Sequence, residues 1–269
     1  MTERPVSPTA VATIARIPYL NSAPFYARWH EAPGTTIDLP PRLLGEEARA
    51  GRADAGLMAA ADYFALAPVF ERVGTFGITC RGPVRSVLLF SRRPVRDLAG
   101  ATVDLTQHSM TSVALTRVLL GARYGLDGVR YERRAVEAGE APQGDAWLLI
   151  GDAALAAARS VAAGVHVVDL GAEWLAWTGL PFVYAVWAVR AGLPSDDKAR
   201  LASFLEDSLT AGEADLAGIA ARAASAQPEL GTAGELASYL GAFRYRLGPD
   251  EEAGLARFRA LWKEYRLDA

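Results

Sequence analysis

Apolar runs and polar turns alternate along the first third of the chain. The apolar runs are rich in β-branched or small residues, and they predict strands at residues 11–19, 35–39 and 53–59. Between them, apolar positions recur at helical spacing, which predicts helices at residues 24–31, 41–53 and 61–70. Strands that alternate with helices in this way are typical of βα units, so we expect a mainly parallel sheet.

The alternation restarts after the turn at Gly82-Pro83. Further strands are expected at residues 84–93, 101–106, 128–136, 145–150, 165–170 and 180–190. A helix is expected at residues 108–126, and a turn and helix follow the strand that ends near residue 150. From Pro194 onward the pattern is almost wholly helical.

Two long apolar runs, residues 84–92 and 181–190, join the two α/β units. The second run lets the chain return to the first unit. We therefore expect an α/β fold of two lobes, with a double crossover and an interlobe cleft. The predicted division is residues 1–90 plus 187–269 for lobe I, which includes the helical C-terminal tail, and residues 91–186 for lobe II.

Composition narrows the class of protein. The 269 residues carry a net charge of −3, which argues against a nucleic-acid surface because such a surface needs a basic face. Cys80 is the one cysteine, so neither an intrachain disulfide nor a cysteine-rich zinc site is expected. The N-terminus lacks the apolar segment of a signal peptide, and no run approaches the ~18 apolar residues of a membrane span. We expect a cytoplasmic monomer or dimer that acts on a small molecule.

The first polar turn lies in the stretch RIPYLNSAPFY, at the end of the first expected strand. Asn21 and Ser22 can cap the next helix through their side-chain oxygens. They can also serve as hydrogen-bond donors for an anionic or hydroxylated ligand, because ligands of open α/β sheets lie beyond the carboxyl ends of the strands. Both interpretations stay open from the sequence alone.

The second polar turn precedes the helix expected at residues 108–126. It contains Thr106, Gln107, His108, Ser109, Thr111 and Ser112. A helix needs one capping hydroxyl, and this turn offers four. Carboxylates bind well at such a place, because the first N–H groups of a helix lack partners and the helix dipole favours negative charge. His108 alone is a weaker candidate, since no carboxylate partner for it is evident.

Three further segments carry candidate residues. Gly151 and Asp152 end an apolar strand, where Asp152 is expected at an N-cap and the glycine would let a ligand approach the backbone. Met58 ends another strand, and either core packing or ligand contact would explain it. Ser86 interrupts the apolar run of a crossover strand, and a buried hydroxyl there needs a partner, which can be a ligand.

Several enzyme signatures are missing from the sequence. It contains no G-x-S-x-G, no G-x-x-x-x-G-K-[ST], no G-x-G-x-x-G and no H-E-x-x-H. A covalent serine nucleophile, a nucleotide-dependent reaction or a zinc hydrolase is therefore unsupported. The expected cleft is rich in neutral donors and poor in acids and bases.

Six stretches of the chain resemble a known family, and they are residues 16–25, 51–63, 82–91, 104–112, 150–155 and 169–187. The chain is similar to the menaquinone biosynthetic enzymes of the futalosine pathway, which share the type II periplasmic-binding-protein fold. Residues 16–25 and 104–112 distinguish best between the members of this family. They favour the members that remove water from chorismate over the sister enzyme, 1,4-dihydroxy-6-naphthoate synthase.

The resemblance implies a hydro-lyase that forms 3-[(1-carboxyvinyl)oxy]benzoate without a cofactor or metal. Asn21 and Ser86 would be catalytic, and the implied substrate-binding residues are Ser22, Met58, Thr106, His108, Ser109, Thr111, Ser112, Gly151 and Asp152. The base stays open between the substrate's own enolpyruvyl carboxylate, His108 and Asp152. A non-catalytic solute-binding protein for a small carboxylate is the alternative class, because it would share the two lobes.

Overall fold

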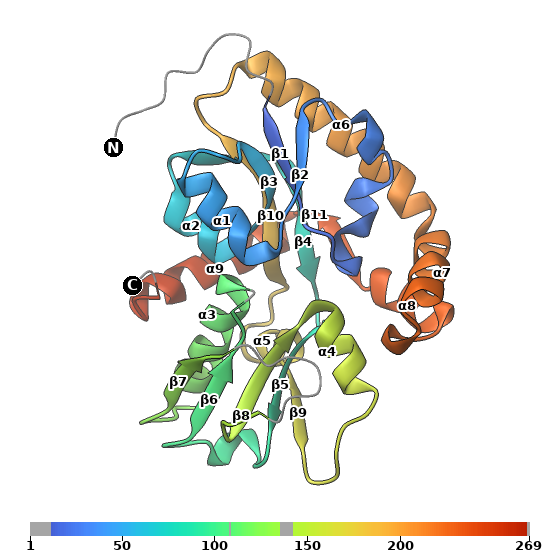
Figure 1. Cartoon of the computed structure of the whole chain (residues 1–269). Coiled ribbons are helices and arrows are strands. Elements are labelled where there is room, and N and C mark those ends of the chain that lie inside the picture. Colours follow the sequence, from blue (N-terminus) through green and yellow to red (C-terminus); the bar gives the residue numbers. More distant parts are fainter. Residues whose placement is uncertain (1–11, 108, 135–141, 268–269) are drawn as a thin grey trace.

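Two β-sheets, one above the other in Figure 1, organise the chain. The computed structural model describes residues 12–107, 109–134 and 142–267. The first sheet has the strand order β11-β4-β10-β3-β1-β2. Its strands are β1 (Thr13–Arg16), β2 (Thr35–Asp38), β3 (Ala55–Ala59), β4 (Phe70–Cys80), β10 (Phe182–Arg190) and β11 (Phe243–Arg246).

The second sheet has the order β7-β6-β8-β5-β9. Its strands are β5 (Val87–Ser91), β6 (Thr102–Leu105), β7 (Arg130–Arg133), β8 (Ala146–Ile150) and β9 (His166–Asp169). Both sheets are mixed: β1 runs parallel to β2 and β3, whereas β10 runs antiparallel to β3 and β4, and β5 runs antiparallel to β8 and β9. The parallel pairing expected for the strands of the first third is confirmed for β1, β2 and β3. The whole sheet is mixed, because β10 enters it in the opposite direction.

Helices cover the faces and edges of both sheets (Figure 1). Those of the first sheet are α1 (Pro41–Arg49), α2 (Ala60–Leu66), α6 (Ser195–Ala214) and α9 (Pro249–Glu264). Those of the second sheet are α3 (Met110–Val118), α4 (Gly151–Ala158) and α5 (Leu170–Thr178). The remaining pair, α7 (Leu216–Ala226) and α8 (Ala233–Leu240), packs together at the side of the molecule. In the described part of the chain, no helix is long and apolar enough to cross a bilayer.

The short helical turns complete the element list. They are η1 (Leu20–Tyr26), η2 (Trp29–Glu31), η3 (Val95–Asp97), η4 (Leu119–Arg123) and η5 (Pro228–Leu230). The helix expected at residues 24–31 is thus two short 3₁₀ turns, η1 and η2. Pro24 lies inside η1 and removes a backbone donor, which disfavours a regular α-helix at this place.

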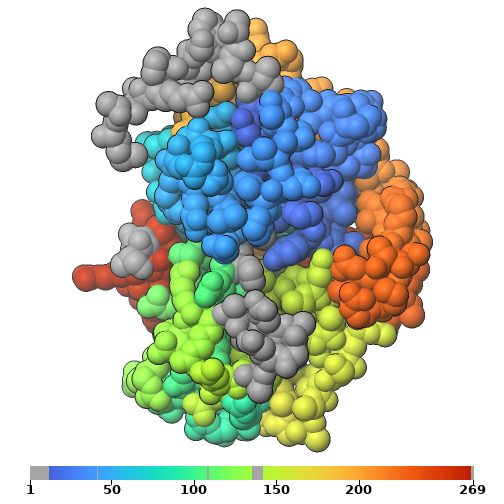
Figure 2. Space-filling view, viewed as in Figure 1, coloured from blue at the N-terminus to red at the C-terminus, as the bar shows by residue number. Residues whose placement is uncertain are grey.

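Sheet membership defines how the chain crosses between the two halves. The first crossover joins β4 of the first sheet to β5 of the second, and the second joins α5 to β10, which returns to the first sheet. In Figure 2 the N-terminal third (blue) lies above the green and yellow residues of the second sheet, and the C-terminal helices (orange) flank both. The limits of the two lobes at residues 90 and 187 remain a prediction.

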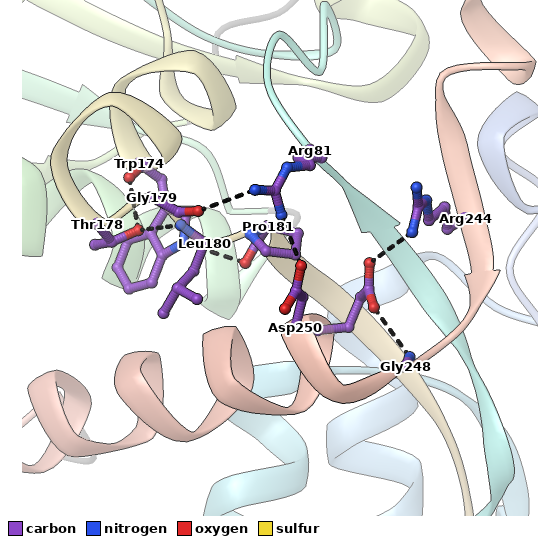
Figure 3. Close-up of polar contacts among 10 residues, drawn as sticks. Arg81, Trp174, Thr178, Gly179, Leu180, Pro181, Arg244, Gly248 and Asp250 are labelled. Atoms are coloured by element: carbon purple, nitrogen blue, oxygen red, sulfur yellow. Dashed lines mark hydrogen bonds and ion pairs between the residues drawn. The ribbon is translucent and has the colours of Figure 1, made fainter.

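The first turn of α9 holds the two crossovers together (Figure 3). Arg81, at the end of β4, forms an ion pair of 3.0 Å with Asp250 of α9 and donates to the carbonyl of Gly179 at 3.4 Å. On the second crossover, the indole N–H of Trp174 donates to the carbonyl of Pro181 at 3.2 Å. A Cβ at Gly254 of α9 would lie 2.2 Å from that same carbonyl oxygen, so α9 is packed directly on the crossover backbone.

Two strands lie outside the elements expected from the sequence. Gly74, Gly77 and several polar residues interrupt the apolar pattern of β4, and pairing with β10 fixes this strand in the sheet. β11 lies in the tail that was expected to be almost wholly helical, and it pairs with β4 at the sheet edge. The helix expected at residues 61–70 ends at Leu66, since Pro68 follows and disfavours helical geometry in the residue before it.

Helix α6 supports η1 through a close backbone contact. The Ser208 hydroxyl, fully buried, donates to the carbonyl of Phe25 at 2.8 Å and accepts the N–H of Arg28 at 3.0 Å. A Cβ at Gly212, one turn further along α6, would lie 2.1 Å from the carbonyl oxygen of Pro24. The chain therefore needs glycine at 212 to bring α6 onto η1.

We expect Gly212→Ala to lower the free energy of unfolding by about 1–3 kcal/mol, because an added methyl group in a packed interface forces the backbones apart. The matched control is Gly234→Ala in α8, where a Cβ would meet nothing within 4 Å and a gain of up to about 1 kcal/mol is expected from helix propensity. Urea unfolding of both variants checks this. Equal effects of the two substitutions would contradict the close α6–η1 contact.

Candidate active site

The turn between β1 and η1 is closed by its own side chains. The buried Ser22 hydroxyl lies 2.6 Å from the carbonyl oxygen of Ile17 and 2.7 Å from that of Tyr19, so its single hydrogen is shared between these backbone acceptors. The Ile17 N–H donates to the phenol oxygen of Tyr26 at 3.0 Å. The expected helix cap by Asn21 or Ser22 is wrong, since Tyr19 precedes η1 and no side chain caps it. Ser22 instead fixes the shape of the turn.

Asn21 is the polar residue that this turn leaves available. It is half-buried, and its side chain forms no hydrogen bond with any residue of the described ranges. A primary amide offers two N–H donors and one carbonyl acceptor. With Ser22 committed to the backbone, Asn21 is the side chain of this turn that can bind a ligand.

The second polar turn, at the start of α3, combines a helix cap with a contact to α2. Ser109 caps α3, and its hydroxyl oxygen accepts the N–H of Ser112 at 3.1 Å. Thr111, almost fully buried, accepts the N–H of Ala61 at 3.0 Å and so ties α3 to the first turn of α2. Thr106 is buried after β6, and His108 lies outside the described residues.

The start of α4 packs against the first turn. Gly151 has φ +59°, and its N–H donates to the carbonyl of Ser86 at 2.8 Å. A Cβ at this position would lie 3.2 Å from the ring of Tyr19, so both the backbone conformation and the neighbouring ring favour glycine. Gly151 thus joins the β1–η1 turn to the crossover residue Ser86.

Asp152 does not cap α4, contrary to expectation. Ile150 occupies the N-cap position without a side-chain hydrogen bond, and Asp152 lies in the first helical turn. Within the described residues, its buried Oδ1 atom has no hydrogen-bond partner. Burial raises the pKa of the Asp152 carboxyl group, and the backbone N–H of Leu20 offsets part of this effect.

A cavity of about 380 Å³ adjoins Asp152, between η1, α4 and the tail. Arg16 of β1 and Arg222 of α7 line it, and each forms an ion pair, with Asp38 and Asp215 respectively. The other lining residues are Pro18, Tyr19, Leu20, Ala23, Tyr26, Ala27, Ile219, Ala223, Gln227 and Leu230. Asn21 is not among them, so the cavity lies beside the polar turn and does not contain its amide.

Ser86 is buried at the crossover, with 1% of its surface exposed. Its hydroxyl oxygen accepts a hydrogen bond of 2.8 Å from the phenol of Tyr239 in α8. Sequence reasoning missed Tyr239, because it lies in the helical tail and its spacing there is that of an ordinary core residue. Met58, by contrast, is 0% exposed and belongs to a small core cluster with Ile17 and Leu44, so the structure favours its core interpretation.

The fold is that of the two-lobed type II periplasmic binding proteins. A protein of Archaeoglobus fulgidus matches with a TM-score of 0.77 at 14% identity, over 95% of this chain and 97% of that one. The alkanesulfonate-binding protein SsuA of Xanthomonas axonopodis pv. citri, bound to MOPS, matches with a TM-score of 0.67 at 17% identity, over 98% and 96%. The aliphatic sulphonate-binding SsuA of Escherichia coli gives 0.65 at 19%, over 97% and 89%.

Sequence comparison defines the family within this fold. A family model described as menaquinone biosynthesis matches residues 12–264. The chain is also 34% identical to the chorismate dehydratase of Thermus thermophilus over 200 residues, which cover 68% of this chain and 70% of the relative. The chain belongs to the menaquinone biosynthesis family.

We expect Asp152→Asn to change how stability depends on pH. A carboxyl group with a raised pKa binds its proton more tightly in the folded than in the unfolded protein, so it lowers stability as pH rises from its ordinary pKa of 3.8 through the folded value. The asparagine variant lacks this loss, and its unfolding free energy relative to wild type should rise with pH. Urea unfolding between about pH 4 and pH 8 measures the difference.

The control for this measurement is Glu229→Gln, which removes a carboxylate from the exposed turn η5. Its unfolding free energy at neutral pH should stay within about 0.5 kcal/mol of that of wild type, as expected for a substitution at an exposed position. A pH profile of Asp152→Asn that runs parallel to that of wild type would contradict the raised pKa.

Proposed function

We propose that the protein removes water from chorismate to give 3-[(1-carboxyvinyl)oxy]benzoate in menaquinone biosynthesis. The observation that carries this proposal is the 34% identity to the Thermus thermophilus chorismate dehydratase, within a family match from residue 12 to residue 264. A cytoplasmic location is part of the proposal, as expected for a biosynthetic enzyme.

The reaction balances without an added reactant. The C–H bond at the ether-bearing ring carbon and the neighbouring C–O bond of the hydroxyl group break, and the proton and hydroxide that are lost add up to one molecule of water. The C–H electron pair completes the aromatic ring, which makes the elimination strongly downhill. The protein therefore has to bind, orient and assist one proton transfer and one hydroxide departure.

The polar groups suit a dianionic substrate. Asn21 offers an amide without a protein partner in the described chain, and Ser86 offers a buried hydroxyl at the crossover. The start of α3 adds the Ser112 hydroxyl, which accepts a hydrogen bond from Ser109 and keeps its own hydrogen for another acceptor, at the positive end of the helix dipole. Neutral donors of this kind stabilise carboxylates without a compensating charge, and Asn21 also stabilises the negative charge that develops on the substrate during the reaction.

Stepwise elimination is the mechanism that we infer. The ring proton leaves first, and the charge spreads into the unsaturated ring carboxylate before hydroxide departs. The substrate's own enolpyruvyl carboxylate is the base that we favour, because the polar turns supply neutral groups. Asp152 and His108 are the competing bases, and the raised pKa of Asp152 strengthens its case.

We expect Asn21→Ala to lower kcat for chorismate by about 10²-fold or more, since removal of one oriented donor at a site of developing charge has effects of that size. Chromatographic detection of the benzoate product measures this. The unfolding midpoint should stay near that of wild type, because Asn21 forms no side-chain hydrogen bond within the described chain. Unchanged kcat would contradict a catalytic role for the residue.

Asp152→Asn and His108→Gln test the identity of the base. With a substrate-derived base, each variant keeps turnover within about tenfold of wild type, because neither side chain takes the proton. Near-complete loss of turnover with intact product binding in one variant would instead identify that residue as the base. Product affinity, measured by calorimetry on the same samples, separates the two outcomes.

A solute-binding protein is the second candidate, and the fold likeness to SsuA at TM-scores of 0.65 and 0.67 favours it. Incubation with chorismate discriminates between the two classes. Binding without formation of an aromatic product would support the solute-binding protein. The sister reaction, naphthoate synthesis, is tested by offering cyclic dehypoxanthinyl futalosine.

A further inference from the structure

The helical tail reaches the crossover through one buried hydroxyl. Tyr239 of α8 is 2% exposed, and its phenol donates to the Ser86 hydroxyl oxygen at 2.8 Å across 153 positions of sequence. Tyr239 and Ser86 are both buried, so water does not compete freely for this hydrogen bond. The contact connects a residue outside the expected site with one inside it.

The backbone around Ser86 is held from two sides. The N–H groups of Val84 and Arg85 donate to the Asp169 carboxylate at 3.1 and 2.7 Å, and Arg85 has a left-handed φ of 61°. The Arg85 guanidinium donates to the carbonyl of Ser238 in α8 at 2.6 Å. The Ser86 carbonyl accepts the N–H of Gly151, as described above. With the backbone fixed in this way, rotation of its hydroxyl is the main freedom left to Ser86.

The Tyr239 phenol determines where the Ser86 proton can go. Because the phenol donates, the Ser86 oxygen is used as an acceptor and its own hydrogen must find another partner. The protein acceptor at hand is the Val84 carbonyl, at a long 3.4 Å. Burial raises the pKa of the Tyr239 phenol, so it stays protonated and remains a donor. The Ser86 hydrogen is thus left for an acceptor on a ligand.

We propose that Tyr239 is a positioning residue that orients the Ser86 hydroxyl toward a carboxylate of chorismate. The proposal rests on the proposed function, in which Ser86 contacts the substrate. Donation by the phenol also polarises the Ser86 O–H bond and strengthens it as a donor. The tail is then part of the active site through α8.

A second buried tyrosine provides a matched control. Tyr245 of β11 is also 2% exposed, and its ring packs edge-on against Phe25 at 5.6 Å. The ring of Tyr239 packs edge-on against Phe243 at 5.0 Å. In the described chain, the Tyr245 hydroxyl has no hydrogen-bond partner. Tyr245→Phe therefore removes no hydrogen bond within this part of the protein, whereas Tyr239→Phe removes the one to Ser86.

The experiment measures kcat and KM for chorismate in wild type, Tyr239→Phe, Tyr245→Phe, Ser86→Ala and the Ser86→Ala/Tyr239→Phe double variant. Tyr239→Phe should lower kcat/KM by about 5- to 30-fold, mainly through KM, as expected for loss of one oriented hydrogen bond to a charged group. Tyr245→Phe should stay within about twofold of wild type. In the Ser86→Ala background, Tyr239→Phe should have no further effect beyond about twofold, because coupled residues are not additive.

Three outcomes would overturn the proposal. Tyr239→Phe could have the same kcat/KM as Tyr245→Phe. It could also lower kcat/KM by the same factor in wild type and in the Ser86→Ala background. Either result would indicate a structural role only. Loss in kcat alone would also contradict the orientation of a binding group. If Ser86→Ala is too slow to measure, the affinity for the benzoate product is determined on the same proteins instead. The double-mutant comparison is then made with these affinities. An inactive wild type would instead reject the proposed function together with this inference.

Discussion

The structure depends on the insertion of β10 between β3 and β4. This strand pairs antiparallel with both neighbours, and its residues Val186 and Trp187 are fully buried. Without it the first sheet would consist of two unconnected parts, β1 to β3 on one side and β4 with β11 on the other. The chain reaches β10 only after it has formed the second sheet, so the first lobe is closed by a segment that returns from the second.

This arrangement explains how distant residues come together. The polar turns follow β1 and β6, the glycine turn follows β8, and Ser86 lies on the crossover between β4 and β5. Direct contacts join three of these places: the Gly151 N–H binds the Ser86 carbonyl, and Gly151 packs against Tyr19 of the β1–η1 turn. The turn after β6 instead contacts the start of α2, where Thr111 binds the backbone of Ala61. The tail adds Tyr239, so that four separate parts of the sequence meet near Ser86 and Gly151.

Much of the fold was predictable, because the βα alternation and the return strand at residues 181–190 leave a clear pattern. The polar turns at Asn21 and at Ser109–Ser112 were also found, since hydroxyl and amide residues after apolar runs are distinctive. What could not be predicted depends on tertiary contacts. β4 is held by its neighbours despite Gly74 and Gly77, and the partner of Ser86 lies 153 residues away. The expected cap at Asp152 also failed at a tertiary contact, since α4 begins at Gly151, which packs against Tyr19, and Asp152 therefore lies inside the first turn.

The late arrival of β10 also bears on synthesis of the protein. From the emergence of Cys80 until that of Phe182, about a hundred residues later, β3 and β4 lack the strand that later separates them. During that interval the nascent chain exposes two unpaired strand edges, one of apolar β3 and one of β4, whose last five residues are buried in the folded protein. Unpaired strand edges of this kind associate with other chains. The ribosome-bound intermediate, more than the finished protein, is therefore the species that calls for chaperone protection.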